Sequence, residues 1–342
     1  MPELRKDPVL GRWIIIARER GKRPSDFVIV EPPTTGGFCP LCSGNENTTP
    51  NEVLVYGRDS NIPNSPGWEV RVVPNKYPAL IIEGDLNREG EGLYDKMNGI
   101  GAHEVIVESP RHEDTFSELS HEHMTMVFRA FQERIRDLEK DDRFRYVLVF
   151  KNFGKAAGAS LEHSHSQLVA LPILPRKIES ELAGALTYYK YKERCVYCDI
   201  IHQELKQDVR VVCKNELFLC ITPFAPRTPF EMWILPVKHS SAYHEQSEGE
   251  MLALAEIFSE ALCRLDACIP NVPYNFVLHT QPLRAQHMHH FHWHFEIVPK
   301  LTSIAGFEWG SGFYINPMPP EEAAAYLRES LERTSEKNLS SR

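Results

Sequence analysis

The fold of this chain is decided by the stretch GASLEHSHSQLVALP at residues 158–172. A loop of small residues leads into two histidines and then into an apolar segment, which predicts a β-strand. Residues i and i+2 of a strand point to the same face, so His163, His165 and Gln167 are expected on one side of a sheet. Alone, the pattern fits a functional pair and an incidental pair of histidines about equally well. The rest of the chain favours function.

The chain contains an internal repeat. Each half has, in the same order, a Cys-x-x-Cys pair, a strand that ends in a histidine, a long helix, a second strand and a His-x-His strand. The matched segments are 39–42 and 195–198, 104–112 and 231–239, 120–138 and 247–265, 146–150 and 274–278, and 163–165 and 292–294. Ordered matches at nearly constant spacing predict a duplicated unit of class α+β, in which mostly antiparallel sheets each carry a long helix. We expect one domain at residues 1–175 and the other at 176–342.

Each half also holds the residues of a metal site. A Cys-x-x-Cys pair followed by two distant histidines is a Cys₂His₂ set, which suits tetrahedral zinc. One such pair alone fits two core thiols or a redox pair, but its repetition favours zinc at two sites. Because four protein ligands close the coordination shell, both sites are expected to be structural. The two sets are Cys39, Cys42, His112 and His163, and Cys195, Cys198, His239 and His292.

With His163 assigned to metal, His165 is free for chemistry. A neutral imidazole is a good nucleophile toward phosphorus, and covalent catalysis divides one difficult displacement into two easier ones. The preceding loop, Gly158–Ser160, is expected to hold phosphate oxygens through its backbone N–H groups and its hydroxyl. Gln167 can donate an amide hydrogen bond to the phosphoryl oxygen.

Composition excludes several classes of protein. The 342 residues are 42% hydrophobic and 25% charged, which is ordinary for a globular chain. A net charge of -9 argues against a nucleic-acid partner. The sequence lacks both a long apolar run and a signal peptide, so we expect a cytoplasmic protein without a membrane partner. Eight cysteines without an export signal indicate reduced thiols or metal ligands.

Together these motifs resemble the galactose-1-phosphate uridylyltransferase family, the transferase branch of the histidine-triad superfamily. The resemblance covers nearly the whole chain and makes both units histidine-triad-like. Its further motifs are an Arg-x-x-Arg-Pro element at 20–24, an Asn-x-Tyr-Pro turn from Asn75, a Glu-Ser-Pro-x-His segment at 108–112 and the block 152–167.

The resemblance implies ping-pong transfer through a nucleotidyl-histidine on His165, with Gln167 as the second catalytic residue. The implied reaction is that of a UDP-glucose–hexose-1-phosphate uridylyltransferase. A homodimer is expected, and the C-terminal sugar-phosphate segment is left open between its own site and the partner's. The implied nucleotide and phosphate contacts are Arg20, Arg23, Asn75, Lys76, Tyr77, Asn152, Gly158, Ala159, Ser160 and Gln167, and the sugar-phosphate segment contains Ser303, Gly306, Phe307, Gly312 and Phe313.

Three departures from the best-known members leave the substrates open. Ser164 replaces a proline, Lys76 replaces an acidic residue, and the Cys195/Cys198 pair replaces a glutamate-and-histidine metal site. These features are similar to the plant ADP-glucose phosphorylase branch, in which phosphate accepts an adenylyl group. Adenylyl transfer to phosphate is therefore the alternative reaction. A zinc-stabilised nucleotide-binding protein without turnover is the alternative outside enzymes.

The second unit is expected to be structural. Glu296 stands where the first unit has Gln167, and a carboxylate repels phosphate. The small-residue loop before the histidines is also missing there. We expect one catalytic centre per chain.

Overall fold

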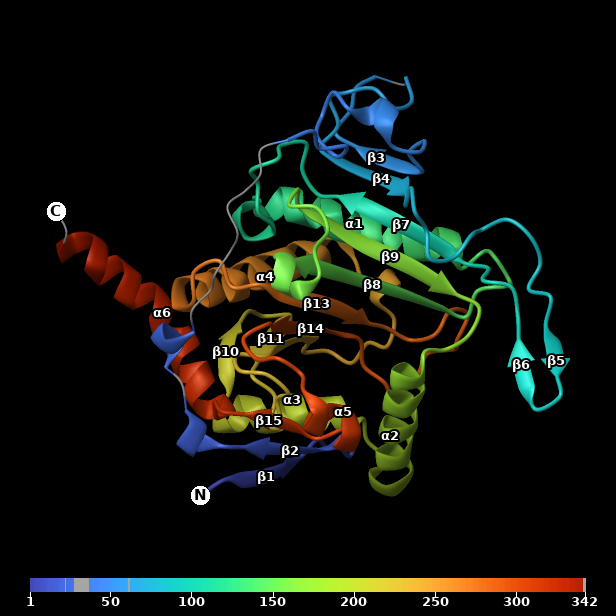
Figure 1. The fold of residues 1–342 in the computed structure, drawn as a ribbon. Coiled ribbons are helices and arrows are strands. Elements are labelled where there is room, and N and C mark those ends of the chain that lie inside the picture. Colours follow the sequence, from blue (N-terminus) through green and yellow to red (C-terminus); the bar gives the residue numbers. More distant parts are fainter. Residues whose placement is uncertain (22, 28–36, 61, 341–342) are drawn as a thin grey trace.

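A computed structural model describes residues 1–21, 23–27, 37–60 and 62–340, with side chains as far as residue 331. Its central feature is a ten-stranded sheet whose neighbouring strands are all antiparallel (Figure 1). From edge to edge the strands are β10 (Val211–Lys214), β11 (Phe218–Ile221), β12 (Met232–Pro236), β14 (His294–Pro299), β13 (Tyr274–His279), β8 (Tyr146–Phe153), β9 (His165–Leu171), β7 (Ala102–Val107), β4 (Val70–Pro74) and β3 (Leu54–Tyr56).

The strand order confirms the duplicated α+β unit. Read outward from the centre, the first unit runs β8-β9-β7-β4-β3 and the second runs β13-β14-β12-β11-β10. At the centre β8 pairs with β13, with Phe150 opposite Val277. The two units therefore share one continuous sheet, and each strand of one unit has a counterpart in the other.

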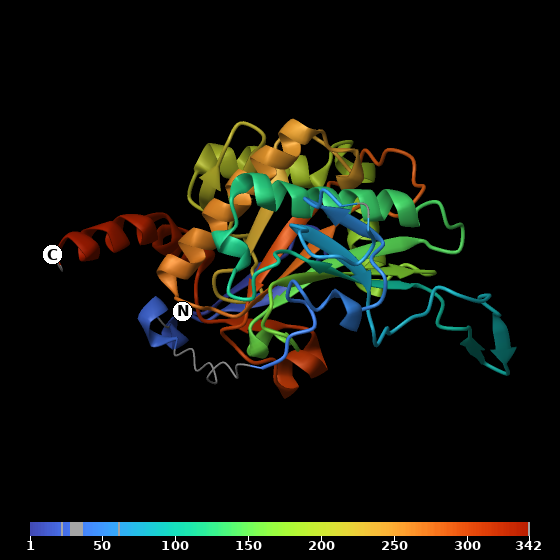
Figure 2. The same ribbon diagram turned by 90° about the horizontal axis from the view of Figure 1, so that it is seen from above.

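Both long helices form where the sequence predicts them. Helix α1 (His121–Leu138) begins after Ser120, whose hydroxyl accepts the N–H of His123, and α4 (Glu248–Cys268) begins with a capping box at Ser247. Both helices lie on the same face of the sheet, as Figure 2 shows. Apolar residues at helical spacing bury one side of each helix against it. Phe128 and Phe258, one from each helix, lie 5.4 Å apart by ring centroid in a single shared core.

The opposite face of the sheet differs between the units. In the second unit it packs against α2 (Arg176–Lys192) and α3 (Val196–Gln207), so Trp233 and Leu235 are buried. In the first unit the corresponding face is more open, and Val105 of β7 is only half-buried. The sheet face beside His165 is therefore less covered in the first unit than in the second.

The remaining elements lie around this frame. A three-stranded sheet consists of β1 (Glu3–Lys6), β2 (Trp13–Ile16) and β15 (Tyr314–Asn316). Within the described ranges, helices fall short of the length and apolar character needed to cross a bilayer. The other elements are the hairpin of β5 (Glu89–Glu91) and β6 (Tyr94–Lys96), the helices α5 (Gly306–Ser311) and α6 (Pro320–Ser340), and the short 3₁₀ turns η1 (Arg18–Arg20), η2 (Pro24–Asp26), η3 (Glu46–Thr48), η4 (Phe116–Glu118), η5 (Lys155–Ala157) and η6 (Tyr243–Glu245).

Candidate active site

His165 is the first residue of β9, and His163 therefore lies in the loop before the strand. The ring Nδ1 of His165 donates to the His163 carbonyl oxygen over 2.7 Å, which fixes the tautomer and leaves Nε2 for a substrate. His165 is 5% exposed. Burial lowers its pKa, and the nearby Lys151 ammonium lowers it further. A neutral imidazole with a directed Nε2 is the state that a nucleophile requires.

A buried ion pair supports the His165 strand from its other face. The Lys151 ammonium lies 2.5 Å from Glu108 and donates to the His165 carbonyl oxygen over 3.0 Å. The hydroxyls of Ser164 and Ser166 both donate to the same Glu108 carboxylate. Ser164, the residue between the two histidines, therefore takes part in this network.

Gln167 is oriented by His103 of β7. The backbone N–H of Ala79 donates to Nδ1 of His103 over 3.1 Å, so the ring hydrogen lies on Nε2. This Nε2 lies 2.9 Å from Oε1 of Gln167 and donates to it. The Gln167 amide nitrogen is then left to donate outward. The Asn75 amide nitrogen is 3.2 Å from the same Nε2, a contact between two donors that we do not count as a hydrogen bond.

The small-residue loop uses its backbone differently from the sequence expectation. The N–H of Gly158 donates to Lys155 and the N–H of Ala159 donates to Gly154, so both groups are paired inside the loop. Gly158 has φ +91°, a left-handed conformation that glycine adopts without strain. Ser160, the last residue of this loop, is exposed, so its hydroxyl is the group that could meet a phosphate.

Asn152 reaches the site from the end of β8. Its preceding residue Lys151 pairs with Ser166, so Asn152 lies beside His165. Asn275 of β13 donates to Oδ1 of Asn152 over 2.7 Å and also to the Ala157 carbonyl oxygen. The second unit thus fixes both the Asn152 amide and the adjacent loop.

The first Cys₂His₂ set converges as predicted. A tetrahedral zinc ion with ordinary bond lengths separates sulfur from nitrogen by about 3.6 Å. Nδ1 of His163 lies 3.7 Å from the Cys39 sulfur and 3.5 Å from the Cys42 sulfur, and Nδ1 of His112 lies 3.4 Å from Cys42. Burial and the neighbouring Cys39 sulfur raise the pKa of Cys42 to about 11. A divalent cation would relieve that repulsion, so these residues fit a metal ion.

The second set has the same geometry on a different element. Nδ1 of His239 and Nδ1 of His292 lie 3.4 and 3.7 Å from the Cys198 sulfur. Nε2 of His292 donates to the Pro236 carbonyl oxygen, which directs Nδ1 toward the sulfurs. Cys195 and Cys198 open helix α3, whose N-terminal dipole stabilises thiolates. In both sets all four ligand atoms lie within 4.8 Å of one another.

A third buried group lies where the second unit has its counterpart of the active site. Glu181, His279 and His294 converge within 4.8 Å, as metal ligands would. Nδ1 of His279 lies 2.8 Å from Glu181, and the Tyr197 hydroxyl donates to the same carboxylate over 2.7 Å. Burial favours the neutral acid, but His279 and His294 outweigh it and hold the pKa of Glu181 at about 2. These three residues therefore form an ion-pair network with one another.

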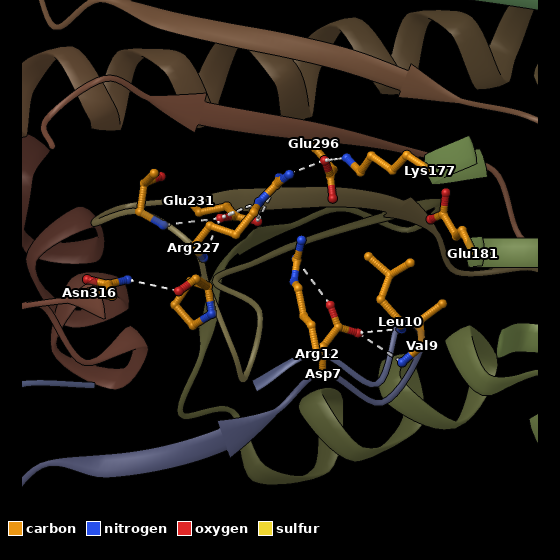
Figure 3. A network of polar contacts seen from close by, with 12 residues as sticks. Asp7, Val9, Leu10, Arg12, Lys177, Glu181, Arg227, Glu231, Glu296 and Asn316 are labelled. Carbon is orange, nitrogen blue, oxygen red and sulfur yellow. Dashed lines mark hydrogen bonds and ion pairs between the residues drawn. The ribbon is translucent and has the colours of Figure 1, made fainter. Parts of the chain in front are cut away.

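Glu296 belongs to the same network. Its carboxylate lies 2.7 Å from the Arg227 guanidinium and 2.9 Å from the Lys177 ammonium, as Figure 3 shows. Arg227 also contacts Glu231. The charge of Glu296 is thus paired inside the protein instead of facing a ligand.

The other predicted contacts are exposed or half-exposed, and their described contacts do not include His165. Arg20 and Arg23 are exposed beside η1 and η2, and their described contacts do not include the His165 site. The exposed Tyr77 and Lys76 follow Asn75 at the end of β4, on the open face of the first unit. The sugar-phosphate segment is on the surface: Ser303, Gly306, Phe307 and Gly312 are exposed, and Phe313 is half-exposed.

Sequence reasoning missed residues that act through others. His103, Asn275 and Glu181 each orient or neutralise a group of the two centres, yet none belongs to a short motif. Alternation offered a partial signal, since His103 shares a face of its strand with the apolar Val105 and Val107. The cross-strand partners became visible only with the strand register.

Comparison with known proteins places the chain in a family. Residues 1–175 match the family described as "Galactose-1-phosphate uridyl transferase, N-terminal domain", and residues 100–341 match a domain of unknown function, DUF4921. ADP-glucose phosphorylase of Arabidopsis thaliana is 36% identical over 336 residues, or 96% of this chain and 93% of that protein. Galactose-1-phosphate uridylyltransferase of Thermotoga maritima is 30% identical over 339 residues, or 96% and 99%.

The fold agrees with this placement. A crystal structure of an Arabidopsis thaliana ADP-glucose phosphorylase with bound ADP-glucose matches with a TM-score of 0.83 and 34% identity. The match covers 96% of this chain and 98% of that one. The chain therefore belongs to the galactose-1-phosphate uridylyltransferase family of nucleotidyl-transfer enzymes.

Proposed function

We propose that this protein transfers a nucleotidyl group from a nucleotide sugar in two displacements at His165. Nε2 attacks the α-phosphorus, the N–P bond forms, the P–O bond to the sugar phosphate breaks, and hexose 1-phosphate leaves. An acceptor phosphate oxygen then attacks the same phosphorus, breaks the N–P bond and restores the imidazole. The carrying observation is the 2.7 Å bond from Nδ1 of His165 to the His163 carbonyl oxygen, which directs Nε2 outward.

The surrounding groups supply charge stabilisation. Gln167, oriented by His103, donates to a non-bridging oxygen as negative charge develops there. Asn152 and Ser160 bind the phosphates, and the turn from Asn75 to Tyr77 binds the nucleoside. We propose that contacts across the interface of a homodimer are made by Arg20, Arg23 and the segment from Ser303 to Phe313. Their exposed positions, and the 79% exposure of Trp309, support an interface there.

For the substrates we favour adenylyl transfer from ADP-glucose to phosphate, which yields ADP and glucose 1-phosphate. Three observations support this choice: the higher identity to the Arabidopsis thaliana phosphorylase, the Ser164 network and the second cysteine pair. Uridylyl transfer from UDP-glucose to a hexose 1-phosphate is the second candidate. It is supported by the Thermotoga maritima relative.

We also propose zinc at both Cys₂His₂ sets. Each ion would cross-link a Cys-x-x-Cys segment to the histidine that precedes the His-x-His strand, and it would take no part in the reaction. In the first unit, this would hold the loop at His163 and so fix the carbonyl oxygen that orients His165. The Cys39 and Cys42 sulfurs would be bound as thiolates.

The test is to trap the covalent intermediate. The protein is incubated separately with ADP-glucose and UDP-glucose carrying a labelled α-phosphate, and acid-labile protein-bound label is measured. Label from ADP-glucose that phosphate removes supports the phosphorylase, and label from UDP-glucose that galactose 1-phosphate removes supports the uridylyltransferase. Absence of label from both donors would contradict catalysis and leave a zinc-stabilised nucleotide-binding protein.

A further inference from the structure

The second unit contains a cavity of about 300 Å³ that the proposed reaction does not use. It lies between the N-terminal hairpin, helix α3 and the ends of β11 and β12. Trp233, Ile221 and Phe224 line it from the sheet, Tyr188 and Glu204 from the helices, and Asp7 from the hairpin. Its size is at the lower end of small-molecule sites. Gln203, which also lines it, is exposed, so the cavity opens to solvent there.

Strand register shows what this cavity corresponds to in the first unit. In each unit, three residues on three adjacent strands pair in a row across the sheet. The row ends two residues after the second histidine of the His-x-His pattern. The matched rows are Ile221–Trp233–Glu296 and Val73–Val105–Gln167. The cavity wall is therefore the counterpart of the surface beside Gln167.

The same register extends past the end of the strand. Two to four residues beyond Val73 lies the segment 75–77, the turn proposed to bind the nucleoside. Two to four residues beyond Ile221 lies the segment 223–225, and all three of its residues line the cavity. The cavity thus occupies, in the second unit, the place of the nucleoside site in the first.

The lining suits a flat heterocycle. Trp233, Phe224 and Tyr188 supply aromatic rings that can stack on such a ligand. The indole Nε1 of Trp233 and the Oε2 of Glu204 are both buried and have no described hydrogen-bond partner. Such unpaired groups are costly to bury, and a ring edge with one acceptor and one N–H would satisfy both after a small side-chain adjustment.

The charges of the lining disfavour phosphate. Three carboxylates, those of Asp7, Asp199 and Glu204, line the cavity, and each is paired with an arginine outside the lining: Arg12, Arg194 and Arg210. Lys6 is the one cation among the lining residues. The counterpart of Gln167 is Glu296, another carboxylate, and its charge is already paired with Arg227 and Lys177. A phosphate would meet one lining cation, Lys6, whereas the guanidinium groups nearby are already paired with carboxylates, so the lining offers little to bind a phosphate.

We propose that this cavity binds a nucleoside or nucleobase without phosphate, as a second site distinct from the His165 site. The inference rests on the proposed function, because the matching turn at 75–77 is itself the proposed nucleoside contact. The ligand class follows from the aromatic walls, the unpaired donor and acceptor, and the single cation of the lining.

The experiment measures binding of radiolabelled adenosine by equilibrium dialysis. Gln203→Trp places an indole at the cavity mouth and should remove one equivalent of bound adenosine per chain. His202→Trp is the matched control, because His202 is exposed on the same helix but does not line the cavity. Unchanged stoichiometry in Gln203→Trp would overturn the proposal. AMP should bind the cavity no more tightly than adenosine, and tighter binding of AMP would overturn the phosphate-free assignment.

Photolabelling tests the location without any substitution. With an azidoadenosine, peptides from residues 196–206 or 221–233 of the wild-type protein should carry label in addition to any from the first site. Label confined to residues 70–80 would contradict the cavity. Trapping of the nucleotidyl-histidine on the wild-type protein is scored separately. A failure of the catalytic proposal is thus distinguished from a failure of the second site.

Discussion

The two units of this protein share strand order, register and a Cys₂His₂ set, but they use the same face of the sheet in opposite ways. In the first unit, Val105 and Gln167 on this face are only half-buried. In the second, His294 and Glu296, the counterparts of His165 and Gln167, lie beneath α2 and are buried. The shared parts are therefore those that build the sheet and its metal sites. The parts that differ are those that would meet a phosphate.

Charge explains why the second unit is closed. Gln167 is neutral and is held by one histidine, so its amide can turn outward to a ligand. Glu296 carries a charge that burial would penalise, and the protein compensates it with Arg227 and Lys177. In the second unit, Glu296 thus fills the counterpart of the active site with the side chains that neutralise it. We infer that a glutamate in place of glutamine at this position, together with the cations that pair with it, distinguishes the structural unit from the unit proposed to react.

The strongest way to break the comparison is a matched pair of histidine variants. His165→Gln removes the proposed nucleophile and should lower nucleotidyl transfer by about 10⁴-fold or more. His294→Gln changes the counterpart residue and should leave transfer by folded protein within about threefold, because His294 acts on stability alone. Steady-state rates, corrected for the folded fraction, measure both. Comparable losses in the two variants would contradict a single catalytic centre.

Metal content tests whether the Cys₂His₂ sets, which both units share, contribute to stability or to the reaction at His165. Wild-type protein purified without chelator should contain two zinc ions per chain, and Cys42→Ser and Cys198→Ser should each lose one. Loss of the first ion should also abolish label on His165, because the loop at His163 is then free. Loss of the second should lower the melting temperature and leave labelling of the folded fraction intact. Elemental analysis of each variant gives the count.

A different metal count would change the comparison. Three ions in the wild type would show that Glu181, His279 and His294 also bind metal. Fewer than one ion per chain would contradict both proposed zinc sites. Serine is the chosen replacement because it is close to cysteine in size and a far weaker zinc ligand.

The buried network of the second unit should matter for stability. Glu181→Gln leaves Glu296 as the one charged partner of His279 in this network. The substitution should cost about 3 kcal/mol of unfolding free energy at pH 7. Glu179→Gln, on the exposed side of the same helix, is the control and should change it by less than about 0.5 kcal/mol. Chemical denaturation gives both values.

The cost of the Glu181 substitution should depend on pH. The folded pKa of Glu181 is about 2, against an ordinary value of 4.5. The carboxylate therefore contributes stability above its unfolded pKa, and the contribution is lost as the pH falls toward the folded value. The difference between wild type and Glu181→Gln should shrink over this window. A constant difference would mean that Glu181 contributes through packing instead of charge.

How much of this arrangement the sequence predicts depends on the range of the interactions. The duplication, both helices and both metal sets follow from local periodicity and spacing, and the structure contains them. The single shared sheet does not follow, because pairing of β8 with β13 joins segments far apart in the chain. Helix α2 and its Glu181 were also not anticipated, since a buried carboxylate leaves no periodic signal. The backbone N–H groups of Gly158 and Ala159 were expected to face phosphate, but a tight turn pairs them internally.

The smallest expected effect concerns His103, whose counterpart in the second unit by register is Glu231, a carboxylate that is paired with Arg227. His103→Ala should free the Gln167 amide to rotate and lower the rate of label transfer to His165 about tenfold, with little change in nucleotide affinity. Gln167→Ala should cost about 10²-fold, since it removes the donor itself. If His103 acts only through Gln167, the double variant should be no slower than Gln167→Ala. A further tenfold loss in the double variant would instead indicate that His103 contacts the substrate directly, and the open face of the first unit would then contain one more binding residue than its buried counterpart suggests.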